Sequence, residues 1–381
     1  MTEPANSFLN IFILAGEASG DKIGADLITE LKQVTKINLS GVGGDNMQKQ
    51  GLTSLFPITD LSVMGIVDVI ARLPLLLWRV RQTVNFIIRS NPQIVVLIDS
   101  QVFSNLVAKG LRKSGYKSSI LLYVSPTVWA YKPQRAKKIK RLYDEILAIL
   151  PFEPAAMKSL NGPKCSYVGH PAIKNPSTKT SPTNSNTIVL MPGSRDGELR
   201  RHLPMFGETA VQLMHSNSEL NFVIITLPHL KKKIISATRN WSVPLKIVTG
   251  SEQRTKYLNE AWLAVCVSGT VTIELAMVQV PMVVAYVMDT AQNNVNKNLQ
   301  VKRISLPNLI LEQDLVPELL MEKPRPDLLT KEVKTLMDNP QNMREQFDGF
   351  SQILKKMQTG TSQFPRRDPV EIIMAHANYK K

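Results

Sequence analysis

Two junctions between an apolar run and a glycine-rich turn could bind an anionic or sugar ligand. The first is residues 16–21, Gly-Glu-Ala-Ser-Gly-Asp, and the second is residues 192–195, Pro-Gly-Ser-Arg. Small residues let backbone amides at a helix start approach a phosphate closely, and Arg195 can hold it through two hydrogen bonds. For the first junction, a tight turn with Ser19 or Asp21 as the helix N-cap is an equally good interpretation.

Asp99 is the candidate general base. It follows the predicted strand 94–98 and so lies at the carboxyl edge of a sheet, where ligands bind in open α/β folds. A carboxylate there can take the proton of an alcohol. An N-cap for the helix near residue 105 explains Asp99 equally well. His170, just before a polar stretch, is a weaker second candidate, because a lone histidine is more often structural.

A third junction could seat a pyrophosphate and a ribose. Ser268, Gly269 and Thr270 follow the predicted strand 263–267 and open a helix that carries Glu274 one turn later. Amides and hydroxyls at a helix start bind phosphate groups, and a carboxylate can accept hydrogen bonds from ribose hydroxyls. Taken singly, Glu274 is more often a first-turn helix carboxylate.

Residues 64–79 combine many apolar side chains with arginines and a tryptophan. As a helix face, such a segment usually lies in the core; as an interfacial element, it would contact a bilayer surface. The residues predicted to contact the membrane are Ile66, Val69, Leu75, Leu76, Trp78 and Arg79. Trp129 and Tyr131 are interpreted as packing residues or as the lining of an apolar acceptor pocket.

The elements that position these residues alternate along the chain. Short apolar runs separated by amphipathic segments predict an α/β fold with mainly parallel sheets covered on both faces. The predicted strands are 11–15, 38–42, 94–98, 119–124, 145–149, 187–190, 221–226, 245–248, 263–267 and 282–286. The predicted helices include 22–34, 75–89, 105–114, 135–143, 204–215 and 270–277.

The domain organisation follows from one polar stretch, residues 173–186, which is rich in Pro, Ser and Thr and predicts a linker. We expect an N-terminal domain at residues 1–172 and a C-terminal domain at residues 187–345, facing each other across a cleft. Closing helices at residues 346–381 are expected to pack back on the N-terminal domain.

The composition excludes several protein classes. The chain has 381 residues, of which 43% are hydrophobic and 20% charged, so it can build two ordinary domains and global disorder is not expected. Two cysteines argue against a disulfide framework and for a reducing compartment. The five histidines show no metal-ligand spacing, so no metal site is expected, and no other cofactor is predicted.

The net charge of +15 predicts a polyanionic partner. Basic residues cluster at 132–141, 195–202 and 231–233. No nucleic-acid-reading motif accompanies them and aromatic residues make up only 6%, so phosphorylated substrates or an anionic membrane are favoured over nucleic acid. The N-terminus lacks a signal-peptide pattern, and no run reaches the ~18 apolar residues of a spanning helix. These features predict a cytosolic protein with peripheral membrane contact at most.

An ordered set of short motifs resembles the lipid-A-disaccharide synthase family of glycosyltransferases. Each motif alone is weak, but the ordered set is highly specific and runs from about residue 12 to about residue 320. The motifs are residues 15–21, 63–67, 124–130 (Val-Ser-Pro-Thr-Val-Trp-Ala), 151–153 (Pro-Phe-Glu), 168–171 (Val-Gly-His-Pro), 192–195, 268–270 with Glu274, and 306–309 (Leu-Pro-Asn-Leu).

The resemblance implies a GT-B fold of two Rossmann-like domains, the second of which binds UDP. It implies inverting transfer of 2,3-diacylglucosamine from its UDP donor to 2,3-diacylglucosamine 1-phosphate (lipid X). The products would be a β-1,6-linked disaccharide 1-phosphate and UDP. The family also implies a reaction without metal, a homodimer, and peripheral association with the cytoplasmic face of the inner membrane of a Gram-negative cell.

Carried over by position, Asp99 is the family's candidate base and Glu17 belongs to its essential N-terminal motif. Arg195 matches the arginine of the Pro-Gly-Ser-Arg motif, which implies a diphosphate contact. The residues expected to bind the UDP-sugar are Gly193, Ser194, Arg195, Ser268, Gly269, Thr270, Glu274 and Asn308. The residues expected around the acceptor or the cleft are Ser19, Gly20, Ser125, Trp129 and His170.

Two segments depart from the family's pattern. The segment after the base usually reads Asp-Ala/Ser-Pro-Asp/Glu-Phe, whereas here Gln101 and Val102 replace the proline and the second carboxylate. Met321 replaces the glutamine of a later Glu-Leu/Phe-Leu-Gln segment. We expect such changes to affect acyl-chain preference or rate rather than to abolish activity.

Two alternatives stay open at this point. One is another GT-B enzyme, such as a UDP-N-acetylglucosamine transferase or epimerase. The other is a basic peripheral membrane protein without enzymatic activity.

Overall fold

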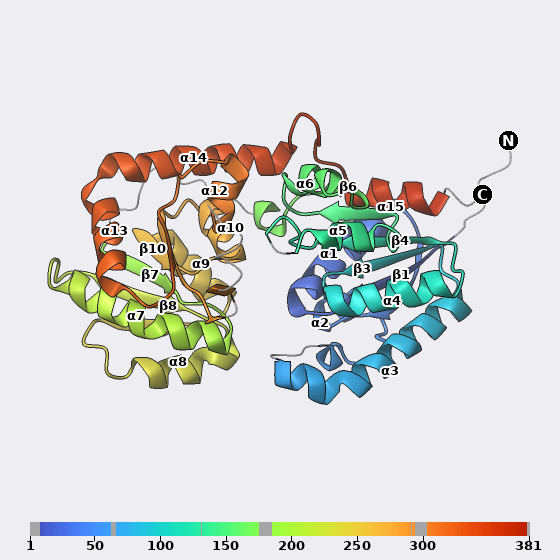
Figure 1. Ribbon diagram of the computed structural model, residues 1–381, viewed down its shortest axis with the longest axis horizontal. Helices are drawn as coiled ribbons and strands as arrows, with labels where there is room; N and C mark the ends of the chain where they lie inside the picture. Colours follow the sequence, from blue (N-terminus) through green and yellow to red (C-terminus); the bar gives the residue numbers. More distant parts are fainter. Residues whose placement is uncertain are drawn as a thin grey trace. The chain divides into compact units, whose positions relative to one another are not determined.

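The computed structural model describes residues 8–61, 66–130, 132–174, 185–290, 292–293 and 303–378. The chain divides into two compact units. The first domain comprises Met1–Pro171 and Gln358–Lys381, and the second domain comprises Ala172–Met357 (Figure 1). Residues 63–65, Tyr131 and most of the polar stretch 173–186 lie outside the described residues.

The first domain is built on a six-stranded parallel sheet in the order β2-β1-β3-β4-β5-β6. The central strand β3, with the sequence Ile-Val-Val-Leu-Ile, is buried at every residue, because helices cover both faces of the sheet. The strands are β1 (Leu9–Ala15), β2 (Ile37–Val42), β3 (Ile94–Ile98), β4 (Ser119–Tyr123), β5 (Glu145–Ala148) and β6 (Lys164–Tyr167).

Helices pack on the two faces of this sheet (Figure 1). They are α1 (Ala18–Val34), α2 (Asp45–Lys49), α3 (Ile66–Ser90), α4 (Gln101–Lys113), α5 (Gln134–Ile139), α6 (Glu153–Ser159) and α15 (Pro369–Asn378). Successive side chains of a strand point to opposite faces of the sheet, so β1 contributes side chains to two hydrophobic cores, one on each face. Ile11 and Ile13 pack with α1 and α15, whereas Phe12 and Leu14 pack with α3 and α4.

The second domain repeats this design with a parallel sheet in the order β12-β11-β10-β7-β8-β9. Its strands are β7 (Thr187–Met191), β8 (Asn221–Ile225), β9 (Leu245–Val248), β10 (Leu263–Cys266), β11 (Met282–Val287) and β12 (Glu318–Met321). Its helices are α7 (Asp196–Met214), α8 (Lys231–Thr238), α9 (Ser251–Glu260), α10 (Thr270–Met277), α12 (Leu306–Leu311), α13 (Pro326–Asp338) and α14 (Pro340–Thr359).

The predicted fold class is confirmed, and each predicted strand is present with both ends within two residues of the prediction. Two strands of the described structure were not predicted: β6, with the sequence Lys-Cys-Ser-Tyr, and β12, with the sequence Glu-Leu-Leu-Met. Each lies at the end of its sheet, so it has a neighbour on one side only and lacks the continuous apolar run of a central strand. The helix predicted at 75–89 begins earlier, at Ile66.

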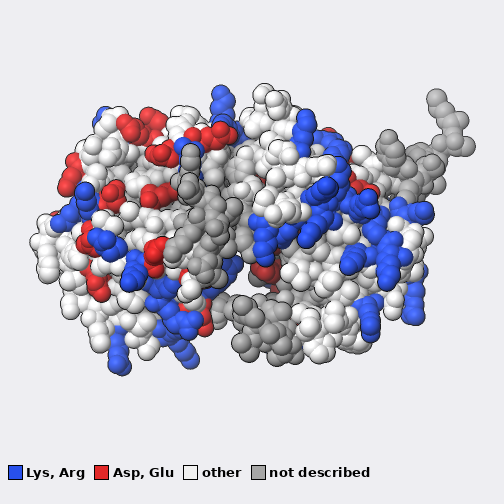
Figure 2. All heavy atoms as spheres, viewed as in Figure 1, with Lys and Arg blue, Asp and Glu red and all other residues white. Residues whose placement is uncertain are grey.

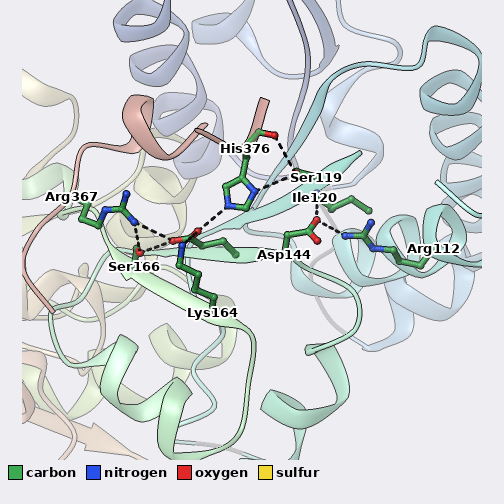
Figure 3. Close-up of polar contacts among 9 residues, drawn as sticks. Arg112, Ser119, Ile120, Asp144, Lys164, Ser166, Arg367 and His376 are labelled. Carbon is green, nitrogen blue, oxygen red and sulfur yellow. Dashed lines mark hydrogen bonds and ion pairs between the residues drawn. The ribbon is translucent and has the colours of Figure 1, made fainter. Parts of the chain in front are cut away.

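A buried carboxylate on β5 fastens the C-terminal segment to the first domain (Figure 3). Glu145 is fully buried and accepts hydrogen bonds from Ser166 Oγ at 2.6 Å and Lys164 Nζ at 2.8 Å. His376 Nε2 lies 2.9 Å from the same carboxylate, and a guanidinium nitrogen of Arg367 lies 3.8 Å away. Burial by itself raises the pKa of Glu145, but the hydrogen bonds from His376, Lys164 and Ser166 outweigh it and hold the pKa at about 2.

Glu145→Gln is expected to lower the free energy of unfolding at pH 7 by about 2 kcal/mol, since hydrogen bonds to a charged group are lost. The folded-state pKa of Glu145 lies below the ordinary glutamate value of 4.5. Its contribution is therefore complete above pH 4.5 and is lost as the pH falls toward 2. Urea unfolding of both proteins across this pH range should show the difference in stability shrinking with acid. A difference that stays constant would contradict the assignment.

Candidate functional site

The carboxyl edge of the first domain's sheet brings the N-terminal motif and the candidate base together. Asp99 and Ser100 directly follow β3, and both adopt left-handed backbone conformations, with φ of 53° and 43°. Two consecutive non-glycine residues in this region cost conformational energy, and such strain concentrates at functional sites. The structure makes Ser100, not Asp99, the N-cap residue of α4, which removes the alternative interpretation of Asp99 as the cap.

The Asp99 carboxyl is partly buried, and burial raises its pKa, an effect that the Ser100 N–H opposes in part. The backbone around it is fixed from two sides. The Asp99 N–H donates to the Tyr123 carbonyl on β4 at 2.9 Å, and the Ser104 hydroxyl donates to the Asp99 carbonyl at 2.8 Å. A carboxylate with a raised pKa is a stronger base toward a hydroxyl proton.

Gly16 lies directly against this turn. A Cβ atom on Gly16 would lie 2.2 Å from the Ser100 Cβ and 2.5 Å from its Oγ, so only glycine fits. Gly20 packs against Ile98 in the same way but less tightly. Glu17 and Ser19, the polar residues between these glycines, are exposed beside the Asp99 turn. The motif 16–21 and Asp99 therefore share one edge of one sheet.

The structure corrects the interpretation of Ser19 or Asp21 as the N-cap of α1, because Glu17 occupies that position. Asp21 is buried and binds the N-terminal end of a different helix, α2. Its carboxylate accepts hydrogen bonds from the backbone N–H groups of Gly44, Asn46 and Met47 at 2.7–3.1 Å, around the first turn of α2. Sequence spacing cannot reveal this role, since the partners lie more than twenty residues away.

The loop after β4 adjoins Asp99 and contains two of the predicted acceptor residues. Ser125 is buried, and its hydroxyl lies 3.4 Å from the Pro126 carbonyl. Trp129 is partly exposed, and its ring meets Phe152 edge to face with centroids 5.1 Å apart. His170, after β6, is buried, and burial lowers its pKa to about 4, so the ring is neutral at pH 7.

Two of the positions that depart from the family's pattern, Gln101 and Val102, lie at the start of α4. Val102 is 78% exposed. Gln101 hydrogen-bonds with Arg135 of α5, so it ties the Asp99 turn to the basic cluster 132–141. On the face drawn in Figure 2, Lys and Arg gather on the first domain in the region of α5. The exposed basic residues of this cluster are Lys132, Lys137, Lys138, Lys140 and Arg141.

In the second domain, Arg195 is the N-cap of α7 and follows Gly193, whose φ is +110°. The Arg195 side chain is 83% exposed and lies 3.2 Å from the Glu198 carboxylate. Glu198 also accepts the N–H groups of Ser194 and Arg195 at 3.0 and 3.2 Å. These two amides therefore already have a partner, the guanidinium of Arg195 is the group that faces solvent, and a phosphate contact at this turn stays a prediction.

The third junction is arranged as expected, with Gly269 as the N-cap of α10. Gly269 and Thr270 are exposed, whereas the Ser268 hydroxyl donates to the Ile304 carbonyl at 2.6 Å. Glu274 forms an ion pair with Arg254 of α9 and remains 40% exposed. Arg254 could not be identified from the sequence as a partner of Glu274, because α9 follows no recognisable motif.

Asn308 lies inside the fold of the second domain. It is buried, and its side-chain amide bonds Val316 through both its nitrogen and its oxygen at 2.8 Å. The same amide nitrogen donates to Glu318, which also accepts the Ile304 and Ser305 N–H groups. These hydrogen bonds fix the conformation of residues 304–318. A contact between Asn308 and the nucleotide stays a prediction. Met321 is buried at the end of β12.

His202 was grouped with the basic cluster 195–202, which the structure corrects. It is fully buried, and burial lowers its pKa to about 4. Nε2 accepts the Val287 N–H at 2.9 Å and Nδ1 lies 2.8 Å from the Glu198 carbonyl, so the ring is neutral and joins α7 to β11. Among the described residues, no group of three or more His, Cys, Asp or Glu side chains could hold a metal ion.

Helix α3 exposes apolar side chains, although not all of those predicted. Leu73, Leu77 and Trp78 are 46%, 45% and 53% exposed, whereas Leu75 and Leu76 are half-buried. Arg79 is not a free cation, because it pairs with Asp60 at 2.6 Å. The side chains of Ile66 and Val69 lie outside the described part of the structure. No helix within the described residues is both long and apolar enough to cross a membrane.

Comparison with known sequences gives a family for this chain. A family model described as Lipid-A-disaccharide synthetase matches residues 11–367. The lipid-A-disaccharide synthase of Rhodopseudomonas palustris is 37% identical over 383 residues, covering 96% of this chain and 97% of the relative. That of Nitrobacter hamburgensis is 36% identical over 367 residues, covering 93% of each.

Comparison with solved structures gives the GT-B fold. The UDP-GlcNAc 2-epimerase of Neisseria meningitidis bound to UDP-GlcNAc has a TM-score of 0.61 at 10% identity, covering 91% of this chain and 99% of that one. The S. aureus MnaA-UDP co-structure has a TM-score of 0.62 at 12% identity, covering 97% and 96%. Acinetobacter baumannii MurG has a TM-score of 0.53 at 13% identity, covering 97% and 99%.

Proposed function

Because the chain belongs to the lipid-A-disaccharide synthase family and is a glycosyltransferase, we propose that it joins two acylated glucosamine units. The donor is UDP-2,3-diacylglucosamine, and the acceptor is 2,3-diacylglucosamine 1-phosphate. The acceptor 6-hydroxyl oxygen forms a bond with the donor's anomeric carbon, whose bond to the diphosphate oxygen breaks. UDP leaves, the configuration inverts, and the product is the β-1,6-linked disaccharide 1-phosphate.

The observation that carries this proposal is the placement of Asp99. It stands at the carboxyl edge of the sheet in a strained turn, with a raised pKa and with Gly16 packed against its neighbour Ser100. In the proposed reaction, the Asp99 carboxylate takes the proton of the acceptor hydroxyl as the new bond forms. Glu17 and Ser19, exposed at the same edge, would contact the acceptor.

The second domain would hold the UDP part of the donor. Arg195 is proposed to bind the diphosphate through its exposed guanidinium, because an arginine fork matches phosphate oxygens. Thr270 and the Gly269 turn would bind at the start of α10, and Glu274 would turn from Arg254 to the ribose hydroxyls. Solved structures of the same fold that contain UDP or UDP-GlcNAc support a UDP-sugar as donor.

Both proposed substrates carry acyl chains, so a membrane surface is the place where the enzyme would meet them. The exposed apolar residues Leu73, Leu77 and Trp78 on α3 suit insertion at the level of the lipid head groups. The basic residues around α5 suit an anionic bilayer. We place this surface at the cytoplasmic face of the inner membrane.

The test is turnover of UDP-2,3-diacylglucosamine and lipid X in detergent micelles, with UDP release and the disaccharide product followed by mass spectrometry. Equal amounts of UDP and disaccharide are expected, and omission of lipid X should stop both. UDP-GlcNAc in place of the acylated donor is the control for another transferase or an epimerase. A folded protein that uses UDP-GlcNAc but makes no lipid disaccharide would overturn the proposal, as would one that neither binds UDP nor makes product.

A further inference from the structure

Arg135 is placed differently from the other basic residues of the cluster 132–141. Its side chain is partly buried, and its guanidinium donates a hydrogen bond to the side-chain carbonyl of Gln101. Helix α5, which carries Arg135, is anchored in the first domain by Ala136 and Ile139, both buried in the core. The base of the Arg135 side chain and its tip are therefore both held. The remaining members of the cluster are exposed: Lys132, Lys137, Lys138, Lys140 and Arg141.

The topology of the sheet brings this guanidinium close to the candidate base. Strands β3 and β4 are neighbours, and the Asp99 N–H after β3 donates to the Tyr123 carbonyl on β4 at 2.9 Å. Gln101 comes two residues after Asp99, a stretch of chain that spans at most about 7 Å. Arg135 comes from the segment after β4. The hydrogen bond between Gln101 and Arg135 thus joins the two segments that leave these neighbouring strands.

Arg135 has no carboxylate to balance its charge within the described part of the chain, where its hydrogen-bond partner is the neutral amide of Gln101. Two other partly buried arginines of this domain differ in this respect. Arg79 pairs with Asp60 at 2.6 Å, and Arg112 pairs with Asp144 at 2.5 Å. A guanidinium is always charged and carries five N–H donors, and burying a charge is costly unless it is paired. Arg135 is therefore ready to bind an anion.

The acceptor in the proposed reaction carries an anion at a suitable distance. Its 6-hydroxyl reacts at Asp99, and its 1-phosphate lies across the same sugar ring. The planar fork of an arginine matches two phosphate oxygens at once. The exposed lysines of the cluster 132–141 add a favourable field for a doubly charged phosphate.

We propose that Arg135, held in place by Gln101, binds the 1-phosphate of the glycosyl acceptor and so selects a phosphorylated sugar. This inference deepens the proposed function and rests on it. Gln101 suits the task because an amide oxygen orients the guanidinium without cancelling its charge. The donors that Gln101 leaves unused are the ones that bind the phosphate.

The test compares two acceptors in non-ionic detergent micelles: lipid X and the same diacylated sugar without its phosphate. Arg135→Gln should lower kcat/KM for lipid X about 10–100-fold, because hydrogen bonds to a charged group are lost. The value for the unphosphorylated acceptor and the donor KM should stay within about twofold, since neither involves the lost contact. Arg135→Lys keeps the charge without the fork and should fall between Arg135→Gln and the parent.

Lys113→Gln is the matched control. It removes the same charge from an exposed position at the opposite end of α4 and should change neither acceptor's kcat/KM.

Gln101→Glu tests the same site without altering Arg135. The new carboxylate has the shape of the amide, gives the guanidinium a counter-charge and suits the first turn of a helix, so α4 should still form. The preference for lipid X over the unphosphorylated acceptor should fall about tenfold or more, because the phosphate must compete with the carboxylate. Gln101→Met removes the amide oxygen without adding charge and should reduce this preference less.

The outcomes separate this inference from the proposed function. A parent protein that makes disaccharide with no preference for the phosphorylated acceptor would overturn the inference alone. So would an Arg135→Gln enzyme that loses activity equally with both acceptors. Co-sedimentation with vesicles of anionic phospholipid distinguishes the acceptor's phosphate from a lipid head group. Arg135→Gln should sediment like the parent, and a variant that loses vesicle binding but keeps its acceptor preference would assign Arg135 to the bilayer instead. A parent that makes no disaccharide from lipid X would overturn the proposed function, and this inference with it.

Discussion

Asp99→Asn is expected to lower kcat by about 10²–10⁴-fold while the affinity for UDP stays unchanged. An amide has nearly the same shape as the carboxyl but cannot take the acceptor's proton. Asparagine also adopts positive φ more readily than most residues, so the turn with φ of 53° at this position should persist. The loss would then report proton transfer and not a change of fold.

The measurement is steady-state turnover together with calorimetric titration of UDP. Asp144→Asn is the matched control, because Asp144 directly precedes β5 and so lies at the opposite edge of the same sheet, where it pairs with Arg112 (Figure 3). That variant should keep kcat. If Asp99→Asn retained more than about a tenth of the parent kcat, general-base catalysis at this position would be excluded.

Gly16→Ala is expected to destabilise the first domain by about 1–3 kcal/mol or more and to remove most of the activity. The new Cβ would lie 2.2 Å from the Ser100 Cβ, closer than any real contact between such atoms. Neither atom is the end of a flexible side chain, so the backbone must move. The segment that moves carries Asp99, and even a small displacement of a catalytic group is costly in rate.

Ser100→Gly should rescue Gly16→Ala. It removes both clashing atoms and leaves the Ser100 Cα, 3.6 Å from the new Cβ, in ordinary contact. Glycine also adopts the φ of 43° found at this position without strain, so Ser100→Gly alone should be nearly neutral in stability. Urea midpoints and turnover of the two single variants and the double variant test this. A double variant as unstable as Gly16→Ala would show that the clash is not the cause.

The local pattern of apolar and polar residues in the sequence is enough to predict most of the strands and the fold class. A central strand such as β3 is apolar at every position because it is covered on both faces, and that run is visible in the sequence. The same reasoning missed β6 and β12, whose places at the sheet ends allow polar residues. It also placed Asp99, Arg195 and Gly269 correctly at the ends of strands or the starts of helices, because small residues and turns mark these junctions.

The sequence could not show which groups the individual side chains contact or hydrogen-bond in the folded protein. Asp21 looked like a cap for its own helix and binds the start of α2, and the Ser194 and Arg195 amides that were expected to bind phosphate donate to Glu198. His202 looked cationic within a basic run and is a buried neutral ring. In each case the charge and the hydrogen bonds depend on what a distant segment brings to the side chain.

By itself, the sequence determined the α/β class, the strand positions and the family, because these depend on periodicity and on motifs read along the chain. Only the tertiary structure decided that Gly16 lies against Ser100, that Glu145 holds the C-terminal segment, and that His202 joins α7 to β11. Burial and long-range contacts set these relationships, and they depend on which strands become neighbours in the folded sheet.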